Sequence, residues 1–257
     1  MAGRVRNLLD GILHRRAMRR WERAGREVRT AALFELRRLR RQAGQLRRRL
    51  DRVIHEADGR LALPLIGSDT IEKPLHTDWT WRPQPWRGPL RPPGIAAIRL
   101  REGIGDSLRV FHDCPLAELS LRQLRNTRTD DLAPFGLVLD VFGFEGSFLS
   151  LVLDLPGQAL QGLTRRHLLR MGLVAEMEQP LEIFARLNIR HGPNSEQLVR
   201  ELQFTYGKSE IDFDLAYTSM NEKRLERAWV DLIFESPRMN RIHLRDITFS
   251  RRPRAAF

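Results

Sequence analysis

The sequence predicts a mainly β protein: an antiparallel, jelly-roll-like β-sandwich preceded by a long Arg-rich N-terminal α-helix. Near Ile95 the apolar period changes from about 3.6 residues, typical of helices, to two, typical of strands. The ten or so short strand-like runs that follow are separated by glycine and proline, which favours a sandwich. We divide the chain into a basic helical arm (1–58), a Pro- and Trp-rich linker that laps the sandwich (59–94) and the sandwich itself (95–257).

Charge and composition separate the same regions. The first 60 residues contain eighteen arginines, no lysine and seven acids, whereas the other 197 contain 26 basic and 25 acidic residues. The single cysteine excludes an intramolecular disulfide and fits a reducing compartment. No apolar run is long enough to cross a membrane, and the N-terminus lacks the apolar core of a secretory signal. We therefore expect a cytoplasmic protein that can associate peripherally with the inner membrane.

The arm is predicted to be helical because only isolated glycines interrupt it between Gly11 and Asp58. Its apolar residues alternate in steps of three and four, which makes a seam of nearly three heptads: Leu36, Leu39, Ala43, Leu46, Leu50 and Val53. The step from Ala32 to Leu36 is four where three is due, a stutter that would unwind a supercoil. This seam predicts either packing on the protein's own domain or self-association through Leu36, Leu39, Leu46 and Leu50.

The first twenty residues form a basic amphipathic pattern. Apolar residues lie on one helical face and arginines flank it, with a tryptophan near the end: Val5, Leu8, Leu9, Ile12 and Leu13, then Arg4, Arg6, Arg15, Arg16, Arg19, Arg20 and Trp21. This composition is typical of a helix that lies on an anionic membrane surface. Nucleic-acid phosphates would attract the same charges, although no base-recognition motif is present. The third interpretation is a solvated helix in an arginine-biased proteome, because the whole chain has only three lysines.

The linker contains five prolines and three tryptophans between His76 and Gly94. Proline fixes the backbone and removes a hydrogen-bond donor, so the segment is predicted to be extended or looped. We favour an interpretation in which Trp79, Trp81 and Trp86 cap the core of the sandwich. The alternative is that they stack on a sugar ring or another ligand.

The sandwich is predicted from alternating apolar residues and the turns between them. The segment from Leu116 to Arg125 and the one from Met220 to Glu226 are expected to be a helical turn or a long loop. The expected strands are 95–101, 107–113, 136–142, 147–155, 167–176, 181–190, 197–205, 210–217, 229–235 and 242–250.

Two resemblances involve this part of the chain. Leu153-Asp-Leu-Pro, His167-Leu-Leu-Arg-Met, Pro180-Leu-Glu-Ile-Phe and Arg245-Asp-Ile-Thr-Phe together resemble the galactose-binding-type jelly rolls of carbohydrate-binding modules. That resemblance implies a sugar ligand. Phe111-His-Asp-Cys-Pro, Asn188-Ile-Arg-His-Gly-Pro-Asn and Ser250-Arg-Arg-Pro-Arg are similar to an uncharacterised bacterial family of unknown function over residues 75–257. This second resemblance implies a bacterial protein and supplies no catalytic residues.

Two predicted strands carry polar side chains on one face. Glu210, Asp212 and Asp214 alternate with apolar residues, so all three lie on the same side of their strand. The same holds for a second strand, whose polar residues are Arg186, Asn188 and Arg190. If the two strands are neighbours, the acids and arginines form a ladder of ion pairs. The sharper alternative is a face that binds a sugar, nucleotide or peptide, with Phe184 as an aromatic platform.

Other chemistry has weaker signals. Asp212, Asp214 and Asp231 could supply calcium ligands, but no loop has dense oxygen-ligand spacing. His112 and Cys114 share a strand face without a third catalytic partner. The histidines are scattered without zinc-ligand spacing, and Gly103–Gly105 lacks the helix of a phosphate-binding loop. We expect no cofactor, no metal and no catalytic residue.

We therefore predict a non-enzymatic binding or scaffold module. The sandwich recognises a glycan or a protein, and the arm attaches it to an anionic surface or to a partner. One alternative is a nucleic-acid-binding arm. The other is a glycan-active hydrolase that uses Asp212, Asp214 or Asp231, which would need two carboxylates at a defined separation.

Overall fold

The computed structural model describes the backbone of residues 2–66, 71–115 and 117–254, and the side chains of these residues except 2–10, 60 and 62–66. The chain divides into two compact units, Met1–Ile54 and His55–Phe257. The boundary lies within a helix, so the last turns of that helix belong to the second unit.

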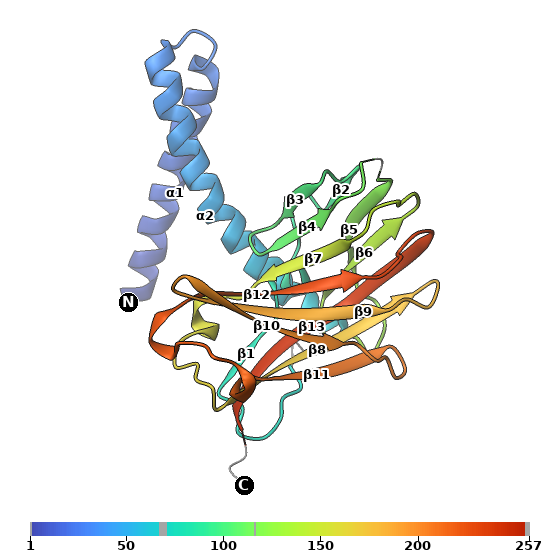
Figure 1. Cartoon of the computed structure of the whole chain (residues 1–257). Helices are drawn as coiled ribbons and strands as arrows, with labels where there is room; N and C mark the ends of the chain where they lie inside the picture. Colours follow the sequence, from blue (N-terminus) through green and yellow to red (C-terminus); the bar gives the residue numbers. More distant parts are fainter. Residues whose placement is uncertain (1, 67–70, 116, 255–257) are drawn as a thin grey trace. The chain divides into compact units, whose positions relative to one another are not determined.

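The first unit is a helical hairpin (Figure 1). Helix α1 spans Ala2–Glu27, and helix α2 begins at Leu33 and runs to Ile66. The Arg20 guanidinium on α1 donates a hydrogen bond to the Gln42 side chain on α2, at 3.1 Å. The N-terminal region is therefore helical as expected, but it is two helices rather than one continuous helix.

The break between the helices coincides with the stutter. Beyond Ala32 the apolar seam shifts by one residue, so a straight helix would turn the two parts of the seam away from each other. Folding back brings them together, because Trp21, Ala24 and Val28 of the first part line one apolar recess with Leu36 and Leu39 of the second. Farther along α2, Leu46, Leu50 and Val53 remain 37, 50 and 66% exposed. Self-association through the seam stays a prediction.

The second unit is a sandwich of two antiparallel sheets (Figure 1), which confirms the predicted fold class. One sheet has the order β11-β8-β13-β6-β5-β2, and β1 also pairs with β13; the other has the order β10-β9-β12-β7-β4-β3. The strands of the seven-stranded sheet are β1 (Trp79–Trp81), β2 (Gly94–Ala96), β5 (Leu119–Arg125), β6 (Phe135–Val141), β8 (His167–Met177), β11 (Lys208–Asp214) and β13 (Asn240–Pro253). Those of the six-stranded sheet are β3 (Arg101–Ile104), β4 (Leu108–His112), β7 (Leu149–Asp154), β9 (Ile183–His191), β10 (Asn194–Glu201) and β12 (Leu225–Phe234).

The core lies between the sheets and follows the period of two. On β9, Ile183, Ala185, Leu187 and Ile189 are fully buried, while the residues between them form the opposite face of the strand. The largest fully buried side chains include Phe213, Phe234 and Phe249 from the two sheets and Trp86 from the segment between β1 and β2.

One expected irregular segment is a strand. Leu119–Arg125 forms β5, which pairs with β2 and β6, so the expectation of a helical turn there was wrong. The alternation is masked because Gln123 occupies an inward, buried position. Its side chain donates to the carbonyls of Pro85 and Gly88 and accepts from the Leu90 amide, which satisfies its polar atoms inside the core. The other irregular segment contains a short helical turn, Glu222–Arg224, as expected.

The segment around Trp86 is packed into the second unit. The four-residue helix α3 (Gln84–Arg87) presents Trp86, which has no exposed surface, and its indole N–H donates to the Leu244 carbonyl at 3.0 Å. Arg82 makes a bidentate ion pair with Asp246 of β13. The end of α2 contacts the same segment, because the His55 ring hydrogen-bonds to the Pro89 carbonyl at 3.1 Å.

Candidate functional site

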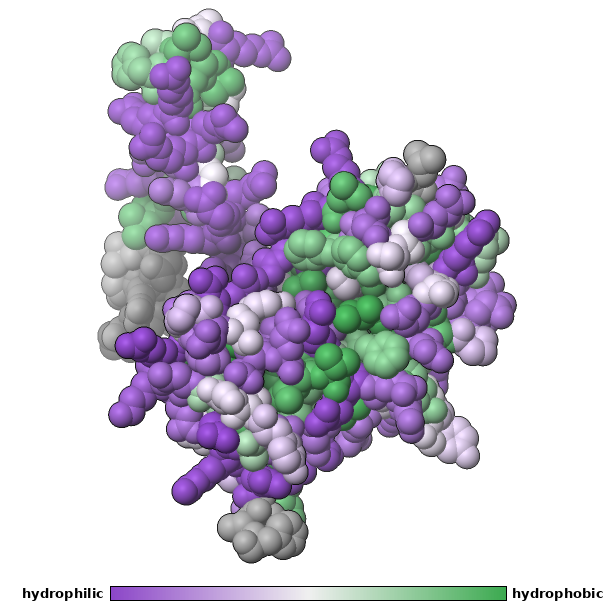
Figure 2. All heavy atoms as spheres, in the orientation of Figure 1, coloured by the Kyte–Doolittle hydropathy of each residue, from purple (hydrophilic) through white to green (hydrophobic). Residues whose placement is uncertain are grey.

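The outer face of the six-stranded sheet, here called the six-strand face, carries the predicted residues of β9. Phe184, Arg186, Asn188 and Arg190 point away from the core, as the period of two predicts. The register gives cross-strand rows: Phe111, Ser150, Ile233, Phe184 and Glu201; then Arg109, Val152, Asp231, Arg186 and Val199; then Asp154, Trp229, Asn188 and Gln197. The six-stranded sheet faces the viewer in Figure 1, and Figure 2 shows apolar side chains in the middle of this face with hydrophilic ones around them.

The middle row is held by a buried carboxylate. Asp231 is 4% exposed and accepts hydrogen bonds from Arg186 at 2.7 and 2.9 Å and from the Asn188 amide at 3.1 Å. Asn188 also donates to the Arg186 carbonyl, so its orientation is fixed from two sides. Arg186 in this row and Asn188 in the next row are thus oriented before any ligand arrives.

Aromatic side chains lie on both sides of that row. Phe184 and Phe111, half-buried, belong to the row on one side. Trp229, also half-buried, lies on the other side, with the Arg227 guanidinium 5.0 Å from its ring centroid. Trp229 was not among the site residues predicted from the sequence. The signal was present, because Trp229, Asp231 and Ile233 alternate along β12 and must share a face.

The acids of β11 lie on the other sheet, so the predicted ladder between them and the arginines of β9 is wrong. Among the described strands β11 pairs only with β8. Asp212 is held instead by Arg170, at 2.8 and 2.9 Å, and by Arg252 at 3.2 Å. The hydrogen bonds from Arg170 lower the pKa of Asp212. Asp214 pairs with Arg254 at 3.3 Å and caps a short helical turn through the Ala216 amide.

The calcium hypothesis fails for the same reason. Asp231 lies on the six-stranded sheet, whereas Asp212 and Asp214 lie on the seven-stranded one. All three carboxylates accept from or pair with arginine. Among the described residues, no group of three His, Cys, Asp or Glu side chains is arranged to hold a metal ion.

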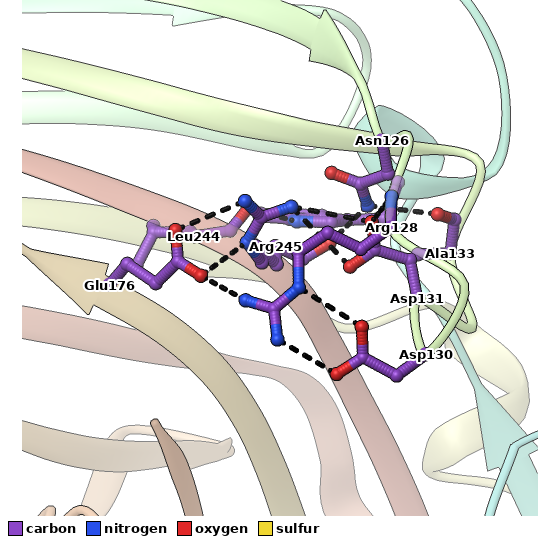
Figure 3. Close-up of polar contacts among 9 residues, drawn as sticks. Asn126, Arg128, Asp130, Asp131, Ala133, Glu176, Leu244 and Arg245 are labelled. Carbon is purple, nitrogen blue, oxygen red and sulfur yellow. Dashed lines mark hydrogen bonds and ion pairs between the residues drawn. The ribbon is translucent and has the colours of Figure 1, made fainter. Parts of the chain in front are cut away.

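A third polar cluster lies beside the seven-stranded sheet (Figure 3). Arg245 pairs with Glu176 at 2.9 Å and with Asp131 at 3.3 Å, and Arg128 bridges Glu176 and Asp130. These residues line a cavity of about 230 Å³ together with Tyr206, a fully exposed aromatic residue with positive φ. This cluster was not predicted from the sequence, because its members come from a loop and two strands that are far apart in the chain.

Two carboxylates of this cluster, Glu176 and Asp130, are held in their charged form. The hydrogen bond from Arg245 lowers the pKa of Glu176, and the one from Arg128 lowers the pKa of Asp130. A carboxyl group with a lowered pKa is ionised at neutral pH and is a poor proton donor. The cluster therefore holds two negative charges that arginine side chains neutralise.

The remaining candidates lie in or against the core. Trp86 is fully buried, so it offers no surface to a ligand in this structure. Trp79 and Trp81 are half-buried and stacked at 6.5 Å, and Trp81 contacts Phe249. Cys114 is buried, and its sulfur accepts from the Glu145 amide. The nearby His112 is also buried, and its Nε2 hydrogen-bonds to the Ile98 carbonyl.

Arginines of the arm line a second recess, which lies between α1 and α2 and has a volume of about 520 Å³. The basic residues that line this recess are Arg16, Arg19, Arg20, Arg23 and Arg38. The predicted Arg15 is exposed on α1, Trp21 has the Arg20 guanidinium 5.8 Å from its ring centroid, and the side chains of Arg4 and Arg6 lie outside the described residues. In the described part of the chain, neither helix contains a stretch that is long and apolar enough to cross a bilayer.

The chain thus consists of a basic helical hairpin followed in sequence by a two-sheet antiparallel sandwich. It belongs to a family of unknown function (DUF6478), whose model matches residues 1–257. A comparison with curated proteins found no match.

Several solved structures are similar to the sandwich. A family 11 carbohydrate-binding module from Clostridium thermocellum, in complex with a mixed-linked tetrasaccharide, is 11% identical with a TM-score of 0.40, and the match covers 63% of this chain and 98% of that one. TmCBM61 in complex with β-1,4-galactotriose is 12% identical with a TM-score of 0.32, over 55% and 86% of the two chains. The enzymatically active domain of bacteriophage CBA120 tailspike protein 4 is 7% identical with a TM-score of 0.39, over 56% of this chain and 19% of that one. Because these identities and TM-scores are low, the fold is assigned from the strand pairing within this chain.

Proposed function

We propose that this protein is a non-enzymatic binding module. Its sandwich binds a glycan on the six-strand face, and its arm attaches it to an anionic surface. The observation that carries the first half is the row pattern of that face, in which oriented polar groups lie between aromatic side chains.

This pattern matches the two sides of a sugar. The C–H groups of a pyranose ring pack on an aromatic ring, while its hydroxyls exchange hydrogen bonds with carboxylate, amide and guanidinium groups. Trp229 and Phe184 supply the aromatic surface, and Arg186 lies in the row between them. Asp231 and Asn188, which are themselves buried, support this row from beneath. Because Asp231 already holds Arg186 and Asn188 in place, a ligand would lose little affinity to ordering these side chains.

The carboxylates of the sandwich support binding over hydrolysis. Glycoside hydrolysis needs one carboxylic acid that keeps its proton near neutral pH. The hydrogen bonds from Arg170 and Arg245 instead lower the pKa values of Asp212 and Glu176. The Oδ2 atom of Asp231 accepts hydrogen bonds from Arg186 and Asn188, so it orients these two side chains.

The arm supports the second half of the proposal through its charge. Residues 1–54 contain seventeen arginines and five acids. Several of these arginines line one recess, so a multivalent anion can contact more than one guanidinium at once.

The test for the sandwich is a glycan array probed with the full chain, followed by titration of the best ligand. We expect W229A and F184A each to weaken binding about tenfold or more, because each removes an aromatic platform. The matched control is Y206A, which removes a fully exposed aromatic residue beside the Arg245 cluster. Unchanged melting temperatures show that the variants are folded.

Three results would count against the proposal: no glycan bound by the full chain, full affinity in both W229A and F184A, or loss of binding in Y206A. The last result would move the ligand to the cavity beside Arg245.

A further inference from the structure

The turn that joins α1 to α2 exposes apolar side chains at the end of the hairpin. Leu33 and Phe34, the first two residues of α2, are 74 and 70% exposed, and Val28 is 44% exposed. We call these three residues the apolar tip. Figure 2 shows the hydrophobic patch at this end of the hairpin. Exposed leucine and phenylalanine side by side are unfavourable in water, so such a patch points to a partner that covers it.

Arginines lie directly behind the tip on both helices. Arg23 and Arg26 belong to the last turns of α1, and Arg37 and Arg38 belong to the second turn of α2; all four are exposed. We call these four the arginine collar. Long arginine side chains can keep their apolar stems along a buried surface while the charged ends reach a polar layer.

The order of the two features selects the partner. An anionic bilayer presents phosphates at its surface and hydrocarbon immediately below, so it can accept the collar and the tip together. A nucleic acid would pair with the collar but would leave Leu33 and Phe34 in water. A second copy of the hairpin joined at the tip would bring two collars together, and like charges oppose that arrangement.

We propose that the apolar tip inserts into the interfacial layer of an anionic lipid bilayer, with the arginine collar at the level of the lipid phosphates. This rests on the proposal that the arm attaches the protein to an anionic surface, and it names that surface and the residues that enter it. It also shifts the inserting segment from the first twenty residues to the turn between the helices.

The first test is co-sedimentation of the full chain with phosphatidylcholine vesicles that contain or lack phosphatidylglycerol. We expect binding only to the anionic vesicles. The variant L33S/F34S should lower the partition coefficient about tenfold or more, because two side chains lose their transfer into the apolar layer. The matched control is V53S/L61S, which removes two exposed apolar residues from the same helix away from the turn and should bind as the unmodified chain does.

The second test reports depth. An environment-sensitive dye is attached through F34C or, as the control, through Q45C, an exposed position of α2. Cys114 is buried and does not compete for the dye in the folded protein. On anionic vesicles the dye at position 34 should shift its emission to the blue, while the dye at position 45 should not.

The outcomes separate the two proposals. If L33S/F34S binds as tightly as V53S/L61S, or the dye at position 34 stays in water, insertion of the tip is refuted while anionic attachment stands. If no vesicle binds the full chain and duplex DNA does, the bilayer is refuted and the anionic partner is a nucleic acid. If neither binds, anionic attachment fails as well, whatever the glycan array shows.

Discussion

Replacement of Arg82 by methionine should strongly destabilise the sandwich. The guanidinium donates to Asp246 through Nε at 2.8 Å and through Nη2 at 2.9 Å, and the two side chains are 1 and 10% exposed. Methionine has a similar length but cannot donate a hydrogen bond. Asp246 would remain in a buried site without the Arg82 guanidinium.

The magnitude follows from burial. Removal of one partner of a buried ion pair costs about 3–5 kcal/mol, because the other charge stays out of water without compensation. For a unit of this size, each kcal/mol lowers the melting temperature by about 2–4 °C, so R82M should melt about 6–20 °C lower. The ion pair between Arg190 and Glu226 serves as the control, because its side chains are 58 and 51% exposed. Such exposed pairs contribute about 0–1 kcal/mol to the free energy of unfolding.

The assay is thermal and urea unfolding of R82M, R190Q and the unmodified chain, followed by near-ultraviolet circular dichroism and tryptophan fluorescence. The fluorescence of Trp86 reports on the packing of this segment, because Trp86 is fully buried and lies four residues after Arg82. If R82M unfolds within about 1 kcal/mol of R190Q, the buried pair does not hold this segment to β13 and the reasoning is refuted.

Two further predictions concern packing and pH. The variant G88A should lower the free energy of unfolding by about 1–3 kcal/mol, because a Cβ at Gly88 would lie 2.6 Å from the His55 carbonyl oxygen. The control variant G157A faces open space and should change the stability little. Equal urea midpoints for the two variants would contradict the packing of α2 on this segment. The arginine-lowered pKa values of Asp212 and Glu176 mean that the stability these groups contribute is present above about pH 4 and is lost as the pH falls through their folded-state pKa values. D212N should therefore be less stable at neutral pH and lose less between about pH 7 and pH 3, and an unchanged slope of urea midpoint against pH would contradict this.

The fold could be predicted from the sequence because strand periodicity is local. The alternation along β9 placed Ile183 and Leu187 inward and Arg186 and Asn188 outward, and the structure confirms it. The strand β5 was not predicted because the inward-facing Gln123 interrupts the apolar alternation. The hydrogen-bond partners of Gln123 lie more than thirty residues away, in the segment around Gly88. A polar residue in the core becomes intelligible only when its partners are known.

The site was harder to predict because sheet order is not local. Asp212 is 42 residues from its partner Arg170, and Asp231 is 45 residues from Arg186. A period of two tells which residues share a face of one strand, but not which strands are neighbours. The ladder was therefore assigned to the wrong pair of strands, although both sets of polar residues do find partners of opposite charge.

The helical arm shows the same limit at the stutter. The shifted seam between Ala32 and Leu36 indicated a local irregularity, and the chain resolves it by reversing direction there. Once the chain reverses, Leu33 and Phe34 lie at the end of a hairpin. In one continuous helix they would have been scattered apolar residues beside the seam.

The two outer faces of the sandwich differ in what a ligand would have to displace. On the seven-stranded sheet, Asp212, Asp214 and Glu176 are already paired with arginines, so a ligand that covers them must remove water from satisfied ion pairs. The six-strand face also contains ion pairs, in which Asp231 pairs with Arg186 and Asp154 pairs with Arg109 and Arg227. Asp231, however, is buried beneath the surface, and its neighbourhood includes the apolar side chains of Phe184, Ile233 and Val199, which are only partly buried or exposed. A ligand on this face gains from covering apolar surface while it meets oriented polar groups. This asymmetry is the physical reason for placing the proposed glycan on the six-strand face.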